Sequence, residues 1–220
     1  MILEKADEIK SILGKLPGKD CGLCGARTCA ELAEKAFGGA MGIERCVYLH
    51  EPKSVIPAGD ELREEDITWK DILGREYDFI LEKFPGDPGP REVIVPFNPV
   101  NVERLGIKKG DILVGRPAWA GCPVTHCGVV MEEPDYFNGM IEWCIVGPTF
   151  AREHGIDIGN YNPVAYEGLA VFPRKELKFG MRYYFMPRYC MLQSRHSGLL
   201  NFIARTENGM SVRLEGIWIS

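Results

Sequence analysis

Four cysteines near the N-terminus stand at a spacing that suits metal binding. Cys21, Cys24, Cys29 and Cys46 follow the pattern C-x2-C-x4-C-x16-C, and a glycine follows each of the first two. A cluster of four irons needs four thiolates, one for each iron. Glycines beside such ligands let the backbone wrap closely and point N–H groups at the inorganic sulfide. The spacing therefore predicts a [4Fe–4S] cluster held by these four side chains.

A zinc site and a pair of disulfides are the alternatives for the same four cysteines. Structural zinc sites commonly pair two C-x2-C knuckles, whereas here a single knuckle is followed by gaps of four and sixteen residues. Residues 1–10 alternate charged and apolar side chains and do not form a signal peptide. We therefore expect a cytoplasmic protein, in which cysteines are metal ligands or free thiols. Zinc and disulfides remain open alternatives.

A second group of cysteines and histidines lies in the C-terminal half. Its residues are candidate ligands of a second metal or redox site that would accept electrons from the first: Cys122, His126, Cys127, Cys190 and His196. Cys144 lies in a predicted strand and is interpreted as a small core residue. The alternative for the segment 187–198 is a loop in which Arg188 and Arg195 form salt bridges and His196 is hydrogen-bonded.

Two short helices are predicted to position the first four cysteines. Apolar residues between Leu3 and Leu16 recur at three- and four-residue spacings, and Pro17-Gly18 stops this helix. Thr28 and Glu31 form the capping pattern of a second helix, which Gly38-Gly39 closes. Cys29 would then be the first helical residue. A cluster there would face a helix N-terminus, whose partial positive charge stabilises an anion.

The rest of the chain divides by composition into a linker and a β-rich region. Residues 51–90 are rich in charge and end in Phe84-Pro-Gly-Asp-Pro-Gly-Pro90. Within them, Thr68 and Asp71, followed by Ile72, Leu73, Tyr77, Ile80 and Leu81, suggest one more short helix. Residues 91–220 alternate β-branched and aromatic runs with turn residues. The predicted strands are Val93–Val95, Ile112–Val114, Gly128–Met131, Met140–Val146, Leu199–Ala204 and Met210–Ile219.

These elements predict an α+β protein. A small helical iron–sulfur module (1–50) is followed by a linker (51–90) and an antiparallel β-rich barrel or sandwich domain (91–220). The chain has 26 basic and 31 acidic residues and no long run of either sign, so nothing indicates binding to nucleic acid. A run of about 18 apolar residues, which a membrane span requires, is missing as well.

The segment around the first cysteines resembles a known module. Leu16-Pro-Gly-Lys-Asp-Cys21-Gly-Leu-Cys24-Gly-Ala-Arg-Thr-Cys29, followed by Cys46, is similar to the small four-iron domain of the corrinoid iron–sulfur protein large subunit and of the Rnf complex B subunit. The resemblance covers residues 14–50 and implies a low-potential [4Fe–4S] cluster in anaerobic metabolism. The remainder departs from both proteins, because it has neither a ferredoxin-type second motif nor a corrinoid-binding portion. The two-part layout is similar to an uncharacterised family of short iron–sulfur proteins in anaerobes.

Three functions are compatible with this pattern. The first is an iron–sulfur electron-transfer protein that works with a redox protein partner. The second is a redox enzyme in which the cluster serves a second metal or cofactor site in the β-rich domain. The third is a non-redox scaffold held by zinc.

Overall fold

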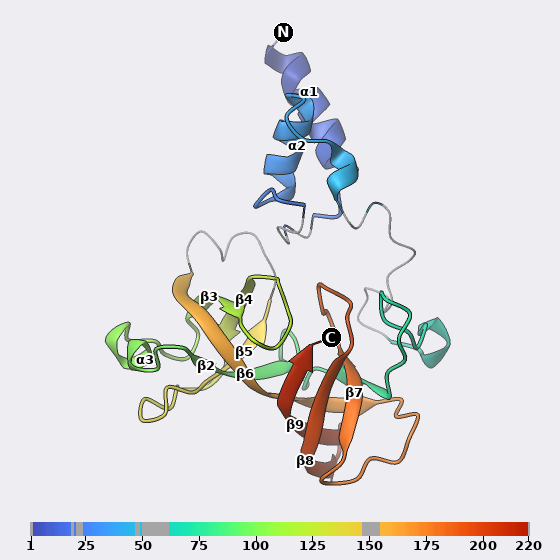
Figure 1. Ribbon diagram of the computed structural model, residues 1–220, viewed down its shortest axis with the longest axis vertical. Helices are drawn as coiled ribbons and strands as arrows, with labels where there is room; N and C mark the ends of the chain where they lie inside the picture. The colour runs from blue at the N-terminus through green and yellow to red at the C-terminus, as the bar shows by residue number, and fades with distance from the viewer. Residues whose placement is uncertain are drawn as a thin grey trace. The chain divides into compact units, whose positions relative to one another are not determined.

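The computed structural model describes residues 2–18, 20, 24–46, 49, 62–146 and 155–219. Contacts between residues divide the chain into two compact units; the described residues up to 49 belong to the first unit and those from 62 onward to the second. Figure 1 labels the elements of both units. No helix in the described ranges is both long and apolar enough to cross a membrane.

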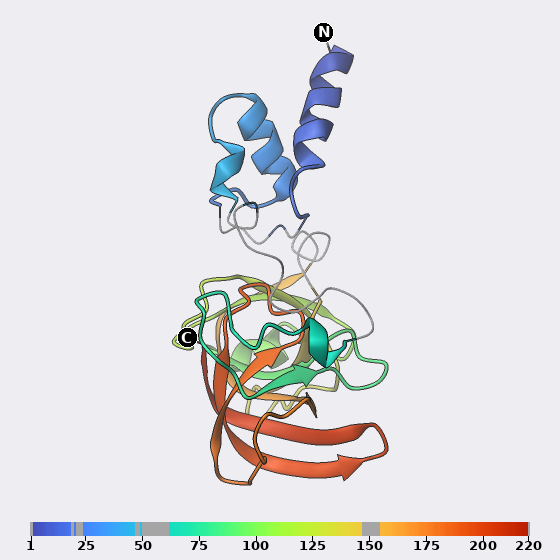
Figure 2. The ribbon, with the colours of Figure 1, turned by 90° about the vertical axis from the view of Figure 1, so that its right-hand side faces the viewer.

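The first unit is helical. It contains α1 (Ile2–Leu13), α2 (Cys29–Phe37) and the short 3-10 helix η1 (Ile43–Arg45). Helices α1 and α2 lie side by side (Figure 2), and the unit has a small apolar core around Leu32 and Ala33. Apolar residues that recur with the helical period of 3.6 residues form one face of each helix, and packing the two faces together buries both.

The predicted boundaries of the second helix are confirmed. Thr28 has an extended backbone, and its Oγ1 accepts a hydrogen bond from the Glu31 N–H at 3.0 Å. The Glu31 carboxylate accepts from the Arg27 N–H at 2.7 Å rather than from Thr28, so the capping box is shifted by one residue. The helix starts at Cys29 as expected, and Gly38 is its C-cap.

The second unit is built on one sheet of nine strands. Their order is β1-β7-β8-β9-β6-β2-β5-β4-β3, and α3 (Val100–Arg104) and η3 (Glu64–Asp66) lie outside the sheet. The strands are β1 (Phe79–Glu82), β2 (Arg91–Pro96), β3 (Ile112–Pro117), β4 (His126–Val130), β5 (Ile141–Ile145), β6 (Ile156–Val171), β7 (Arg182–Pro187), β8 (His196–Thr206) and β9 (Gly209–Ile219).

The prediction of a small helical part and a β-rich part is confirmed, but the sheet is not purely antiparallel. Strands β1 and β7 pair in parallel, as do β3 and β6, whereas the other pairs are antiparallel. The sheet is therefore mixed. Strands β8 and β9 form the longest hairpin, which is curved in both Figure 1 and Figure 2.

Strand β6 is the element on which the sheet closes. It is the long orange strand of Figure 1, and its length lets it pair with two strands along each edge. Its first half pairs with β3 and its second half with β9 on one edge, while β2 and then β1 follow on the other. Two circuits of paired strands result, and they share β6: β1-β7-β8-β9-β6 and β6-β2-β5-β4-β3.

The segment expected to be a linker contributes one strand to the sheet. Residues 79–82 form β1 between β6 and β7, with Phe79, Ile80 and Leu81 fully buried. The helix expected after Thr68 is absent from this described stretch. Asp71 instead accepts hydrogen bonds from the Leu73 and Arg75 N–H groups, each at 2.9 Å, and so organises a turn.

A buried carboxylate lies in the core of the second unit. Glu92, on β2, is fully buried and lies next to the apolar cluster that contains Trp143 and Tyr161. Its Oε2 accepts from Trp143 Nε1 at 2.7 Å and from the Tyr161 hydroxyl at 3.2 Å; its Oε1 accepts from the Tyr166 hydroxyl at 2.9 Å. Three donors thus compensate for the water that Glu92 loses on folding.

Replacing Gly168 of β6 by alanine should strongly destabilise the second unit. A Cβ at this position would lie 2.3 Å from the Glu82 carbonyl oxygen of β1. Because that oxygen belongs to a buried strand, relieving the clash requires a backbone shift, which costs about 1–3 kcal/mol or more. Urea denaturation followed by tryptophan fluorescence measures this, since all four tryptophans lie in the second unit.

Gly159→Ala is the matched control on the same strand. A Cβ there meets no atom within 4 Å, and only the φ of +69° opposes it. We expect a smaller loss, about 1–2 kcal/mol. Equal losses in the two variants would contradict the close packing of β1 against β6.

Glu92→Gln should change how stability depends on pH. Burial raises the pKa of Glu92 from 4.5 to about 7, so the stability that it contributes is full below pH 4.5 and is lost as the pH rises through about 7. Burial lowers the pKa of His196 from 6.5 to about 4, so its contribution to stability increases as the pH rises from about 4 to 6.5. The two effects oppose each other in the native chain.

Glutamine has nearly the same shape as Glu92 but does not titrate; its amide oxygen can still accept from Trp143 and Tyr161, and its NH2 group can donate to the Tyr166 oxygen. The free energy of unfolding of the variant should therefore rise between pH 4 and 6.5 by on the order of 3 kcal/mol relative to the native chain. Urea denaturation at several pH values measures this. Glu103→Gln, which removes an exposed carboxylate of α3, should leave the native curve unchanged. Parallel curves for Glu92→Gln and the native chain would contradict the assignment.

Candidate functional site

Three of the four N-terminal cysteines belong to the core of the first unit. Cys29 and Cys46 are buried there with Leu32 and Ala33, and the half-buried Cys24 packs against the same residues. Cys29 begins α2, and Cys46 follows η1, so the chain returns to the core after the helix ends. The fourth predicted ligand, Cys21, lies outside the described residues.

The N-terminus of α2 carries an acidic partner. The Cys29 N–H donates to Oδ1 of Asp20, which is itself buried and has a φ of +43°. Burial raises the pKa of the Cys29 thiol, and the neighbouring Asp20 carboxylate adds to this effect. Gly25, directly after Cys24, has a φ of +90°, a conformation that side chains oppose. The backbone turn that glycine was expected to permit beside the ligands is therefore present.

The donor chemistry of this core suits an iron–sulfur cluster. Thiols are the ligands that iron–sulfur clusters take, and a partly apolar shell limits access of water to them. Among the residues that the structure describes, no three His, Cys, Asp or Glu side chains lie close enough together to bind one metal ion.

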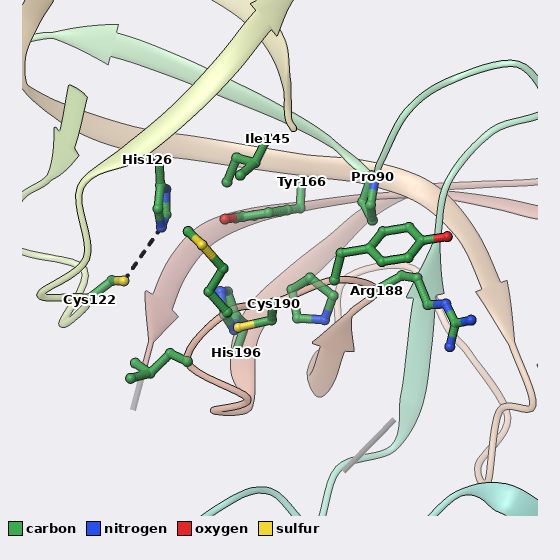
Figure 3. Close-up of a pocket in the computed structure, with 12 residues that line it drawn as sticks. Pro90, Cys122, His126, Ile145, Tyr166, Arg188, Cys190 and His196 are labelled. Carbon is green, nitrogen blue, oxygen red and sulfur yellow. Dashed lines mark hydrogen bonds between the residues drawn. The ribbon is translucent and has the colours of Figure 1, made fainter. Parts of the chain in front are cut away.

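The second group of predicted residues gathers around a pocket of the second unit. Cys122, His126, Cys190 and His196 all line a small cavity of about 40 Å³, while Cys127 is buried outside its lining. Figure 3 shows these four side chains on the pocket wall, with Arg188 at the far end from Cys122. No three of them surround a common ion position in this part of the chain, so a second metal site stays a prediction.

The pocket lies where the two circuits of strands meet. His126 is the first residue of β4 and His196 the first residue of β8, so each circuit contributes one histidine. Tyr166, on the shared strand β6, also lines the pocket, with its ring 5.4 Å from that of His196. Residues of both circuits and of their shared strand β6 thus line one pocket.

A chain of hydrogen bonds leads from the pocket to the buried carboxylate. Cys122 Sγ lies 3.6 Å from His126 Nε2, which is the dashed line in Figure 3, and His126 Nδ1 lies 2.6 Å from the Tyr161 hydroxyl. That hydroxyl donates to Glu92 at 3.2 Å. Burial raises the pKa of Cys122 to about 12, so the resting thiol keeps its proton.

The loop between β7 and β8 supplies the other wall. Tyr189 and Gln193 have φ values of +66° and +51°, which are unfavourable for residues other than glycine. The loop is braced from outside: Asp71 accepts from the Arg195 N–H at 3.2 Å, and the Ile72 N–H donates to the Gln193 carbonyl at 3.0 Å. The strained loop is thus held in place by the segment before β1.

The simpler interpretation of this loop is also confirmed in part. Arg188 forms an ion pair with Glu82 at 3.3 Å, and His196 Nδ1 lies 3.0 Å from the Ser194 carbonyl oxygen. Arg195 donates to a backbone carbonyl, that of Glu76, rather than to a carboxylate. Cys144 is fully buried, as expected of a core residue.

Sequence reasoning missed Glu92, Tyr161 and Tyr166. A glutamate beside Arg91 at the start of an apolar run suggests a solvent-exposed strand end. Alternation along β2, however, places Glu92 on the same face as the buried Ile94, and this was the available signal. The tyrosines lie on β6, which the turn-forming residues Gly159, Pro163 and Gly168 concealed.

Comparison with known proteins supports the cluster site. The family model described as "Putative Fe-S cluster" matches residues 16–48. An uncharacterized protein of Methanocaldococcus jannaschii is 28% identical over 226 residues, which cover 97% of this chain and 94% of that protein. No solved structure matches the chain. The family match indicates an iron–sulfur protein, and the similarity to the M. jannaschii protein extends over both units.

Proposed function

We propose that this chain is an electron-transfer protein whose first fifty residues hold a [4Fe–4S] cluster through Cys21, Cys24, Cys29 and Cys46. The observation that carries the proposal is that Cys24, Cys29 and Cys46, up to 22 residues apart in the sequence, belong to one small core. The family match over residues 16–48 supports an iron–sulfur cofactor at the same place. Four thiolates at this spacing favour the four-iron type.

The surroundings of the cysteines favour a low reduction potential. Reduction adds one negative charge to the cluster, and the buried Asp20 carboxylate beside the Cys29 N–H opposes that addition. The resemblance to the four-iron domains of the corrinoid iron–sulfur protein and of Rnf complexes supports the same conclusion. We propose a cytoplasmic role in anaerobic metabolism, in which a redox protein partner exchanges single electrons with the cluster.

Alanine at any of the four cysteines should abolish the cluster. Each thiolate binds one iron, so its loss leaves one corner of the cluster without a protein ligand. We expect about four irons and four sulfides per native chain and a large loss in each variant, as measured by metal and sulfide analysis after anaerobic purification. A signal in electron paramagnetic resonance on dithionite reduction should disappear in parallel.

Cys144→Ala is the control, because it removes a buried thiol of the second unit. It should keep the native iron content. Four irons retained without Cys29 or Cys46 would overturn the ligand assignment. One zinc per colourless chain would favour the scaffold, and iron beyond four or a further metal would favour the enzyme with a second metal site.

Asp20→Asn should raise the reduction potential of the cluster. Asparagine keeps an oxygen that accepts the Cys29 N–H but removes a negative charge close to a ligand. The Coulomb energy of one charge at several ångströms in a partly buried site is about 1–2 kcal/mol, which corresponds to a rise on the order of 50–100 mV for one electron. Redox titration followed by electron paramagnetic resonance measures it.

Glu34→Gln is the matched control, since it removes one exposed negative charge further along α2. Solvent and salt screen that charge, so the potential should stay close to the native value. A potential that is unchanged or lower in Asp20→Asn would contradict a cluster at the N-terminus of α2.

A further inference from the structure

Three of the four cysteines of the second unit have described acceptors near their S–H groups, and these acceptors differ. Cys144 Sγ donates to the Gly89 carbonyl at 3.1 Å, and Cys190 Sγ lies 3.9 Å from the Ser194 carbonyl. Cys122 Sγ faces an imidazole nitrogen at 3.6 Å. A carbonyl can accept a hydrogen bond but does not take the proton, whereas a neutral imidazole does both. Cys122 is therefore paired with a group that can act as a base.

The hydrogen-bond chain behind His126 sets which of its nitrogens is the base. Above a pH of about 7, where Glu92 is ionised, its carboxylate can only accept, so the Tyr161 hydroxyl donates to it. The Tyr161 oxygen then accepts from His126 Nδ1–H, at 2.6 Å. This leaves His126 Nε2 without a proton and directed at Cys122 Sγ. The buried network therefore holds the imidazole in the tautomer that general-base catalysis requires.

Cys122 stands at the junction of two cavities. It is the residue common to the linings of the small pocket of about 40 Å³ and of a groove of about 480 Å³. Arg116, Trp119 and Asn160 also line the groove, and Trp119 is 83% exposed. Because Cys122 lines the groove, a molecule bound there lies against the residue that carries the thiol. The exposed guanidinium and amide of the groove favour a ligand that carries carboxylates.

We infer that Cys122 is a nucleophilic thiol, with His126 as its general base, and that it exchanges with small anionic disulfides taken up in the groove. This inference concerns the second unit and does not depend on the proposed cluster. Thiol–disulfide exchange requires a thiol, a base and access for the disulfide, and the site supplies all three. Attack at sulfur develops no oxyanion, so no oxyanion hole is needed.

The exchange balances without a further reactant. His126 Nε2 takes the thiol proton as Cys122 Sγ attacks one sulfur of the disulfide. The disulfide bond breaks, a new S–S bond joins Cys122 to the attacked sulfur, and the other sulfur leaves as a thiolate that receives the proton from the imidazolium. Cys122 is oxidised to a mixed disulfide, and one half of the substrate is reduced to a thiol.

The test uses the full chain, purified anaerobically and exposed to oxidised glutathione. Peptide mass spectrometry follows glutathione addition at each cysteine with time. Cys122 should react at least about tenfold faster than Cys144 and Cys190, given the usual effect of a general base. His126→Gln should lower the rate at Cys122 at least about tenfold, because glutamine keeps the hydrogen bonds but takes no proton. Cys144→Ala, which removes a thiol outside the linings of both cavities, should leave the rate at Cys122 unchanged.

Two further measurements keep the inference falsifiable. Tyr161→Phe keeps the base but removes the hydroxyl that fixes the tautomer of His126. It should lower the reaction rate at Cys122 by less than His126→Gln does, and it provides a second test if His126→Gln folds poorly. Arg116→Ala should slow the reaction with oxidised glutathione but not with the neutral hydroxyethyl disulfide. Iron content should stay native in every variant, which separates this result from any failure of the cluster proposal.

Three results would overturn the inference. The first is a Cys122 that reacts no faster than Cys144 or Cys190. The second is a folded His126→Gln variant that reacts at the native rate. The third, an equal effect of Arg116→Ala on both disulfides, would remove the anionic substrate class.

Discussion

The burial of Glu92 is the constraint on which the arrangement of the second unit depends. A carboxylate taken out of water needs replacement donors, and it finds them on β5 and β6. A slip of one residue in the pairing of β2 with either strand would turn Glu92 away from Trp143 or Tyr161 and bury it without partners. The carboxylate thus specifies register as well as occupying the core. The same hydrogen bonds orient Tyr161, and through it His126, so the fold and the pocket rest on one interaction.

Strand β6 explains why a pocket forms at this place. A strand that pairs with four neighbours belongs to two circuits, and side chains from both circuits meet along it. The close approach of β1 is possible because Gly168 has no side chain: a Cβ there would lie 2.3 Å from the Glu82 carbonyl oxygen. The loop between β7 and β8 then closes the pocket in a strained conformation, which Asp71 and Ile72 support from the preceding segment. Local strain in the loop is therefore balanced by hydrogen bonds to residues more than a hundred positions away.

The features that sequence reasoning predicted correctly are local ones. The cap at Thr28, the helix start at Cys29 and the runs that became β2, β3, β4, β5, β8 and β9 all follow from side chains close together in the sequence. Strand β6 was missed because its glycines and Pro163 indicate turns locally. The strand tolerates Pro163 because this residue lies beside an irregularity in the pairing with β2. Strand β1 was missed because Ile80 and Leu81 were assigned to the helix expected after Thr68, and only its two partner strands show that Phe79–Glu82 is extended. Cys122, His126, Cys190 and His196 were recognisable by type, but Glu92 and Tyr161 become part of the site only through long-range pairing.

Cysteines of one chain can serve different chemistry because neighbours, not the thiol itself, decide reactivity. In the first unit, cysteines from three places in the sequence share one core, and the helix N-terminus that begins at Cys29 already has an acidic partner in Asp20. In the second unit, burial raises the pKa of Cys122 and of Cys144 alike, to about 12 in each case, so burial does not distinguish the two thiols. What distinguishes them is the acceptor: a carbonyl keeps the Cys144 proton in place, whereas His126 can remove that of Cys122. Since the tautomer of His126 depends on Tyr161 and Glu92, the reactivity of a thiol at the pocket wall is set by a carboxylate buried in the core.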